Sequence, residues 1–142
     1  MPHEDQLAAV DLFAQFTRKD LTRIGRAVVE RKYKKGETIL KEGEQGVAFF
    51  VLFKGKVEVT KGAGAKKQKV AVLAPGSVFG EQALLDGEHR DATVTALDDV
   101  ECLVLSRWDF VAELRTNPHM AVAMLPILSK RLRRCNERLE HM

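Results

Sequence analysis

One segment of the chain carries residue types whose spacing suits an anionic, hydroxylated ligand. Gly80 allows the backbone a positive φ angle or a close approach to a ligand, and Glu81 follows it directly. Residues 82–85 suit one turn of helix, whose first amides would lack partners inside the helix and could bind an anion. Arg90 adds a planar cation suited to phosphate. Because a carboxylate accepts hydrogen bonds from hydroxyl groups, the segment predicts a site for a sugar phosphate.

The same segment resembles the phosphate-binding cassette of the cyclic nucleotide-binding domain family. That cassette reads approximately F-G-E-x-A-L-x-x-x-x-P-R-x-A-T/S-V, and the residues that match it are Phe79-Gly80-Glu81, Ala83-Leu84, Arg90 and Ala92-Thr93-Val94. Upstream residues also resemble the β-roll of this family, namely Gly36-Glu37, Glu42-Gly43, Gly55-Lys56-Val57 and Leu73-Ala74-Pro75-Gly76. The resemblance covers about residues 7–140, nearly the whole chain.

The resemblance implies a regulatory domain that binds a cyclic nucleotide, with cAMP as the expected ligand and cGMP as the second choice. The family pattern assigns Glu81 to the ribose 2′-hydroxyl and Arg90 to the cyclic phosphate. The other expected ligand-binding residues of the cassette are Gly80, Gln82, Ala83, Asp91 and Ala92. The preference for cAMP rests on position 91, which lacks the Thr hydroxyl that cGMP-preferring members often carry.

The resemblance also assigns a role to the C-terminal helix. In bacterial transcription regulators of the family, this helix forms dimers and contacts the adenine base. Aligning Lys130-Arg131-Leu132 with the equivalent run places Cys135 and Asn136 at the contacting positions. We therefore expect Asn136 to bind the purine edge, a homodimer to form through this helix, and the ligand to shift the helix.

Two residues depart from the family pattern and leave an alternative open. Asp91 stands where the family usually has a small residue, and it would repel a phosphodiester by about 1 to 4 kcal/mol or pair with Arg90. His89 replaces the usual Pro, so the loop is less rigid. The alternative is a degenerate roll that binds no nucleotide and serves as a protein–protein interaction module. Arg90 and Glu81 could likewise form only a surface ion pair.

The elements around the cassette predict a mainly β fold with flanking helices. Apolar residues at helical spacing predict an N-terminal helical pair within residues 4–27, with a capping box at Thr17 and Asp20. Short strands follow in residues 28–106, of which the apolar run 48–53 is expected to be buried on both faces. With the resemblance, these form an eight-stranded jelly-roll β-barrel with its cassette at 79–94, inside a single domain, 1–142.

The C-terminal helices are expected within residues 107–141. Ser106 is a candidate N-cap, and Trp108 is expected in the core. Pro126 should kink or split the last helix. A broad apolar stripe on that helix could pack on the roll or on a second subunit, and it consists of Val122, Leu125, Leu128, Leu132 and Leu139.

The composition excludes several other classes. The 142 residues carry a net charge of +3 and are 45% hydrophobic, which is ordinary for a globular protein. Residues 1–5 lack the pattern of a signal peptide, and Cys102 and Cys135 match no metal spacing, so we expect a cytoplasmic protein with reduced thiols. Catalytic motifs and a helix-turn-helix are absent from the sequence, so we expect no enzyme, no metal, no membrane contact and no direct nucleic-acid binding. A DNA-binding portion located elsewhere stays open, as does an unknown effector protein.

Overall fold

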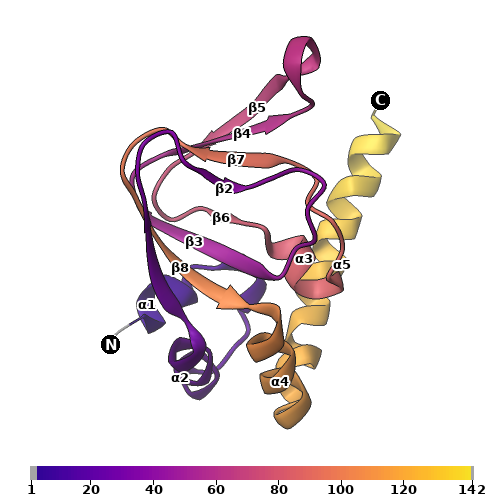
Figure 1. Cartoon of the computed structure of the whole chain (residues 1–142). Coiled ribbons are helices and arrows are strands. Elements are labelled where there is room, and N and C mark those ends of the chain that lie inside the picture. Colours follow the sequence, from indigo (N-terminus) through magenta and orange to yellow (C-terminus); the bar gives the residue numbers. More distant parts are fainter. Residues whose placement is uncertain (1–2, 142) are drawn as a thin grey trace.

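Eight short strands form two four-stranded antiparallel sheets that face each other (Figure 1). This computed structural model describes residues 3–141. Of the N-terminal residues 1–5 considered above, Met1 and Pro2 lie outside the described residues, as does residue 142 at the C-terminus. One sheet has the order β1 (Val29–Tyr33), β8 (Val100–Ser106), β3 (Ala48–Lys54) and β6 (Val78–Phe79). The other has the order β2 (Thr38–Leu40), β7 (Thr93–Ala96), β4 (Val57–Lys61) and β5 (Gln68–Leu73).

Helices flank the sheets at both ends of the chain. The N-terminal helices are α1 (Glu4–Ala8), the short 3₁₀ helix η1 (Asp11–Phe13) and α2 (Arg18–Ala27). Inside the roll lie η2 (Gly64–Lys66) and α3 (Glu81–Asp86), and the chain ends with α4 (Arg107–Thr116) and α5 (His119–Glu140). The predicted class, mainly β with an N-terminal helical pair and C-terminal helices, is confirmed.

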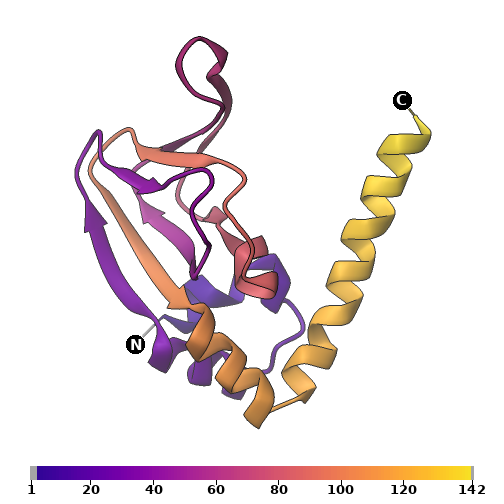
Figure 2. The ribbon, with the colours of Figure 1, turned by 45° about the vertical axis from the view of Figure 1, so that its right-hand side comes forward.

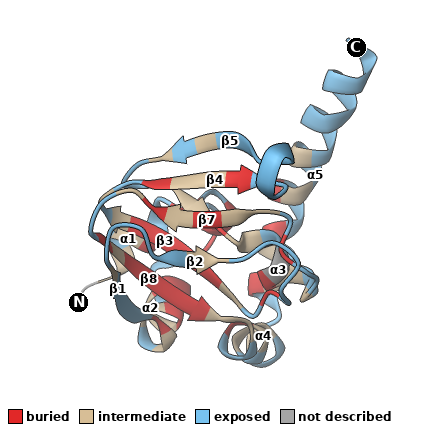
Figure 3. Cartoon of the chain, turned by 45° about the horizontal axis from the view of Figure 1, so that its top comes forward, coloured by how far each residue is buried: buried red, intermediate tan, exposed pale blue. Residues whose placement is uncertain are grey.

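Strand β3 separates two hydrophobic cores, as the continuous apolar run predicted. Phe49 and Val51 point into a core shared with the helices, whereas Phe50 and Leu52 point into the core between the two sheets. Since successive side chains of a strand point to opposite faces, a strand between two cores must be apolar at every position. Figure 3 shows β3 and β8 as the buried centre of the molecule.

A buried carboxylate fixes the start of α2. The Thr17 side chain accepts from the Asp20 amide and the Asp20 side chain accepts from the Thr17 amide, so the predicted capping box is confirmed. Asp20 Oδ1 also contacts Arg23 Nη1 at 2.8 Å and His119 Nε2 at 2.7 Å. Burial acts to raise the pKa of the Asp20 carboxyl, but the hydrogen bonds from Thr17 and His119 outweigh it and lower the pKa.

Two local expectations need correction, and one strand was not expected at its position. Trp108 is 71% exposed, because the inward face of α4 presents Phe110 to the core instead. Pro126 lies inside α5 without splitting it, since the helix continues from His119 to Glu140. The two-residue strand β6 was not anticipated, because so short an element has no periodic signal.

Helix α5 uses only its first half to pack on the domain. Met120, Met124 and Ile127 are buried, as expected for one helix face at spacings of three and four. Leu128 of the apolar stripe packs against the core that the roll shares with the helices. The other members of the stripe are exposed, namely Val122, Leu125, Leu132 and Leu139. The second half of α5 extends away from the sheets (Figure 2) and is exposed over most of its length (Figure 3). Within residues 3–141, none of the helices is long and apolar enough to span a bilayer.

Candidate functional site

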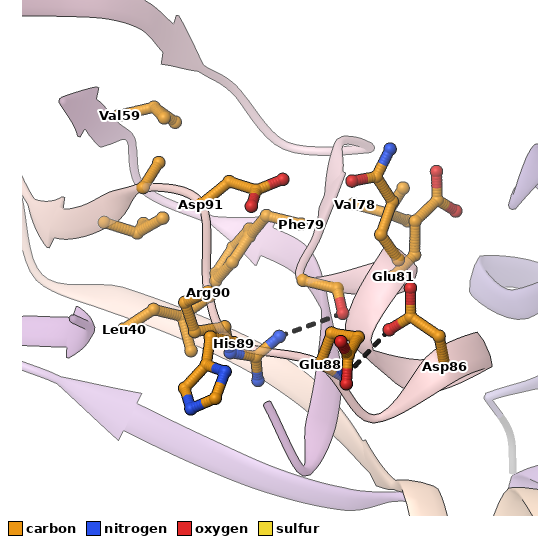
Figure 4. A pocket seen from close by; sticks show the side chains of 14 residues that line it. Leu40, Val59, Val78, Phe79, Glu81, Asp86, Glu88, His89, Arg90 and Asp91 are labelled. Atoms are coloured by element: carbon orange, nitrogen blue, oxygen red, sulfur yellow. Dashed lines mark hydrogen bonds between the residues drawn. The ribbon is translucent and has the colours of Figure 1, made fainter. Parts of the chain in front are cut away.

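A cavity of about 310 Å³ opens where the two sheets, α3 and the loop before β7 meet (Figure 4). The polar part of its wall comes from the segment that runs from β6 through α3 to β7. Leu40 of β2 and Val59 of β4 add apolar wall from the opposite sheet. The volume falls in the lower range for small-molecule sites, which is roughly 300–1,000 Å³.

Gly80 makes room for the Arg90 side chain at the end of β6. Its φ angle is +78°, and a Cβ atom at this position would lie 2.6 Å from Arg90 Nη1. The Arg90 guanidinium donates to the carbonyl oxygen of Gly80 at 3.0 Å (Figure 4) and to that of Ala48 at 2.5 Å. The glycine is therefore required both for the backbone turn and for the position of the arginine.

Arg90 is a buried cation beside the cavity. Only 8% of the residue is exposed, and burial lowers its pKa although the charge of Glu44 acts in the opposite direction. Among the ion pairs of residues 3–141, none joins Arg90 to a carboxylate. Asp91 is exposed, and Figure 4 shows its side chain pointing in a different direction from that of Arg90. Because a buried charge needs compensation, the arrangement is suited to an anionic ligand.

Backbone hydrogen bonds fix the loop that carries Arg90. The Arg90 amide donates to the Glu44 carbonyl at 2.7 Å, and the Arg90 carbonyl accepts from the Gly43 amide at 3.0 Å. Gln45 and His89 form an isolated antiparallel bridge on the same loop. The turn at residues 42–46 thus holds the loop, and His89 contributes to this pairing in place of the usual rigid Pro.

Glu81, the first residue of α3, is paired with a residue that the sequence did not identify. Its Oε1 atom lies 2.9 Å from Nη1 of Arg131 on α5, so the suggested pair between Arg90 and Glu81 does not form. The Glu81 Oε2 atom is buried and has no hydrogen-bond partner in the described part of the chain. One oxygen of this carboxylate is therefore fixed by Arg131, and the other is an acceptor that is shielded from solvent and has no partner among the described residues.

Most of the predicted site residues meet at the cavity. Its lining includes Gly80, Glu81, Gln82, Arg90, Asp91 and Ala92, and Ala83 lies within α3. Asn136 is exposed on α5 and does not belong to the described residues that line the cavity. Arg131 follows Met124 and Ile127 at spacings of seven and four, which places it on their packed face of α5, but this spacing does not indicate Glu81 as its partner.

The fold and the site together define a small β-domain with room for an anion beside a buried arginine. The sequence model described as "Cyclic nucleotide-binding domain" matches residues 30–117, and the chain belongs to this family. The two facing sheets with flanking helices are the jelly-roll arrangement of its members, as predicted. Among residues 3–141, no group of three or more His, Cys, Asp or Glu side chains could hold a metal ion.

Relatives of the chain occur among both bacterial and animal proteins. The cyclic AMP receptor protein of Thermus thermophilus is 35% identical over 111 residues, which cover 78% of this chain and 51% of that protein. The cGMP-dependent protein kinase 2 of Homo sapiens is 38% identical over 107 residues, which cover 73% of this chain and 14% of the kinase. The chain thus spans about half of one relative and a small part of the other.

A solved structure with a similar fold supports the same family. It is the N-terminal domain of a transcriptional regulator from Streptomyces coelicolor A3(2), with 30% identity and a TM-score of 0.85. The match covers 94% of this chain and 96% of that one. The similarity therefore includes the flanking helices as well as the sheets.

Proposed function

We propose that the chain is a regulatory domain that binds cAMP, with cGMP as the second choice, in the cavity beside Arg90. The observation that carries this proposal is the buried Arg90 guanidinium, which borders the cavity and has no carboxylate partner in the described chain. A cyclic phosphate would supply the missing negative charge through charge-assisted hydrogen bonds. The free Oε2 atom of Glu81 would accept a hydrogen bond from the ribose 2′-hydroxyl.

The remaining cassette residues complete the proposed contacts. Backbone groups of Gly80, Ala83, Asp91 and Ala92 would surround the phosphate, and Gln82 contributes to the wall of the cavity. The preference for cAMP rests on residue 91, which offers no hydroxyl group to a guanine base. Relatives named for cyclic AMP and for cGMP are similarly close in sequence, so only a titration with both nucleotides decides between them.

Helix α5 would connect ligand binding to a response. Asn136 lies on its exposed second half, so a contact with the purine requires α5 to move toward the cavity. A ligand that binds the closed arrangement better than the open one would shift this equilibrium. Cys135, whose thiol is exposed, lies next to Asn136 on this turn of the helix.

We also propose that α5 pairs with a second copy of the chain. Leu125, Leu132 and Leu139 are 60%, 65% and 66% exposed and recur every seven residues, the spacing of a coiled-coil seam. Sedimentation equilibrium tests this pairing: Leu132→Glu should give monomers, whereas Lys130→Glu, an exposed position on the opposite side of the helix from the seam, should leave the dimer intact. A monomeric wild-type chain at high concentration contradicts the pairing.

The experiment that tests nucleotide binding is a calorimetric titration of the nucleotide-stripped protein with cAMP and then cGMP. Arg90→Ala should weaken binding by at least about tenfold, because hydrogen bonds to charged groups contribute about 1.5–3 kcal/mol. Arg90→Lys keeps the charge but not the planar fork, so its affinity should lie between those of the wild type and Arg90→Ala. Arg115→Ala, on the surface of α4, is the control. Circular dichroism checks that each variant is folded.

The second candidate function is a roll that binds another protein and no nucleotide. Asp91 favours it, because an exposed carboxylate in the cavity wall repels a phosphate. Absence of heat and of a thermal shift with either nucleotide at millimolar concentration would support this candidate. In both cases we propose a binding rather than a catalytic role, in the cytoplasm, where the free thiols Cys102 and Cys135 stay reduced.

A further inference from the structure

The connection between β4 and β5 carries a cluster of lysines that the nucleotide site does not use. Residues 61–70 form this lysine hairpin, which extends beyond the other strands (Figure 1, Figure 2), and every one of them is exposed. Its four lysines are Lys61, Lys66, Lys67 and Lys69. None of them belongs to the described residues that line the cavity. The hairpin is therefore a surface of its own, separate from that cavity.

The positive charge of this surface is concentrated and largely unpaired. Between Glu58 and Glu81 the chain has four Lys and no other charged residue, a charge of +4, whereas the whole chain carries +3. Lys69 lies 3.4 Å from a carboxylate oxygen of Glu58. The other three lysines of the hairpin take part in none of the ion pairs of the described chain. Free cations of one sign on one turn create a positive potential that attracts an acidic partner.

Hydrogen bonds fix the backbone that presents these lysines. The Gly62 amide donates to Oε1 of Glu42 at 2.9 Å, which ties the hairpin to the loop after β2. The Lys66 amide donates to the Ala63 carbonyl at 3.1 Å and closes the turn. Gly62 has a φ angle of +81°, and a Cβ atom there would lie 2.6 Å from the Lys66 carbonyl oxygen. Because the backbone is preformed, a partner does not have to order it, which lowers the entropic cost of binding.

Apolar side chains lie beside the lysines. Strand β5 is at the edge of its sheet, and its residues Val70 and Val72 are 54% and 46% exposed. Val70 follows Lys69 directly in the chain. Between residues 54 and 78 there is no aromatic residue, so the hairpin offers no ring to stack on a nucleobase or to anchor at a membrane interface. The surface is thus both basic and aliphatic.

We propose that the lysine hairpin docks an acidic, partly apolar segment of a partner protein. The carboxylates of such a segment would pair with Lys61, Lys66 and Lys67. Its apolar side chains would cover Val70 and Val72, which phosphate groups of a nucleic acid or a lipid would leave exposed. The partner would be the effector protein that the sequence left unidentified, bound outside the nucleotide cavity.

Fluorescence anisotropy with a labelled peptide of alternating glutamate and valine residues tests this docking. The wild-type chain should bind the peptide saturably, and added salt should weaken the binding because it screens exposed charges. The same peptide with glutamine in place of every glutamate should bind at least about tenfold more weakly, since several ion pairs are lost.

Two charge-reversal variants with the same net charge separate the hairpin from the rest of the surface. Lys66→Glu combined with Lys67→Glu should weaken binding of the acidic peptide by about tenfold or more. Lys32→Glu combined with Lys34→Glu reverses two exposed lysines at the other sheet and should leave the affinity within about threefold of the wild type. Val70→Ser should weaken binding about threefold, because less apolar surface is covered. Circular dichroism checks that each variant is folded.

Several results would overturn the proposal. They are the absence of saturable peptide binding at millimolar concentration, equal weakening by the two charge-reversal variants, and an unchanged affinity in Val70→Ser. Duplex DNA, or vesicles of phosphatidylcholine and phosphatidylserine, bound more tightly than the peptide would also overturn it and indicate a phosphate-bearing partner. A chain that binds the peptide through the hairpin but binds no cAMP would refute the proposed function alone.

Discussion

Replacing Gly80 by alanine tests whether this glycine is required by the arginine beside it. The φ angle at Gly80 is +78°, and an added Cβ would meet Arg90 Nη1 at 2.6 Å and the Ala48 carbonyl oxygen at 3.2 Å. The substitution therefore introduces backbone strain and forces the guanidinium away from its carbonyl partners.

The two effects have different magnitudes. An alanine held in the left-handed region costs about 1–2 kcal/mol of unfolding free energy. Displacement of Arg90 from Gly80 and Ala48 removes two charge-assisted hydrogen bonds of 3.0 and 2.5 Å, each of about 1.5–3 kcal/mol. Partial relaxation reduces the sum, so we expect Gly80→Ala to lower stability by about 2–4 kcal/mol.

Gly76→Ala is the matched control. Gly76 has a φ angle of +98°, but an added Cβ would meet nothing within 4 Å. This variant should therefore show the backbone strain alone, about 1–2 kcal/mol, and bind nucleotide as the wild type does. Urea unfolding measures both stabilities, and calorimetric titration with cAMP measures the affinities.

The reasoning would be refuted if the two alanine variants lost the same stability and kept the same affinity for cAMP. That result would mean that Arg90 is not held against Gly80, or that its position does not matter for the ligand. A large loss of affinity only in Gly80→Ala is the expected result.

Three further predictions concern charge and thiol chemistry. Asp91→Ala should bind cAMP about fivefold more tightly than the wild type, because an exposed carboxylate repels a phosphate by about 1 kcal/mol at about 4 Å in water. Added salt should reduce this difference in cAMP affinity. Hydrogen bonds outweigh burial and lower the pKa of Asp20, so its stabilising effect is present above its unfolded-state pKa and is lost as the pH falls through its folded-state pKa. The difference in unfolding free energy between the wild type and Asp20→Asn, measured by urea unfolding, should therefore shrink below about pH 4. A difference that grows at low pH would disprove this prediction. Cys135 is exposed, whereas burial raises the pKa of Cys102 to about 12, so a thiol reagent should label one cysteine of the folded protein, and none in Cys135→Ser.

Most of the fold could be predicted from patterns of residues that are close together in the sequence. The apolar run of β3 indicated burial on both faces, and Thr17 with Asp20 indicated the start of α2. Such features depend on residues that are close in sequence, so a pattern can predict them. The exposure of Trp108 could not be predicted in this way, because α4 carries apolar residues on more than one side and only tertiary packing selects Phe110.

The candidate site could be predicted in part for a related reason. The residues from Gly80 to Ala92 that line the cavity belong to one continuous segment with a recognisable motif. The contact between Glu81 and Arg131 joins residues 50 positions apart, and neither residue type indicates its partner. The contact becomes visible only in the fold, where α5 packs against η1 and the Arg131 side chain reaches Glu81 on α3.

The measurement that tests the central claim most directly is a crystal structure of the chain grown with cAMP. The account predicts the cyclic phosphate within hydrogen-bond distance of the Arg90 guanidinium and the ribose 2′-hydroxyl at Glu81 Oε2. A nucleotide bound elsewhere, or a cavity that stays empty at saturating cAMP, would contradict it.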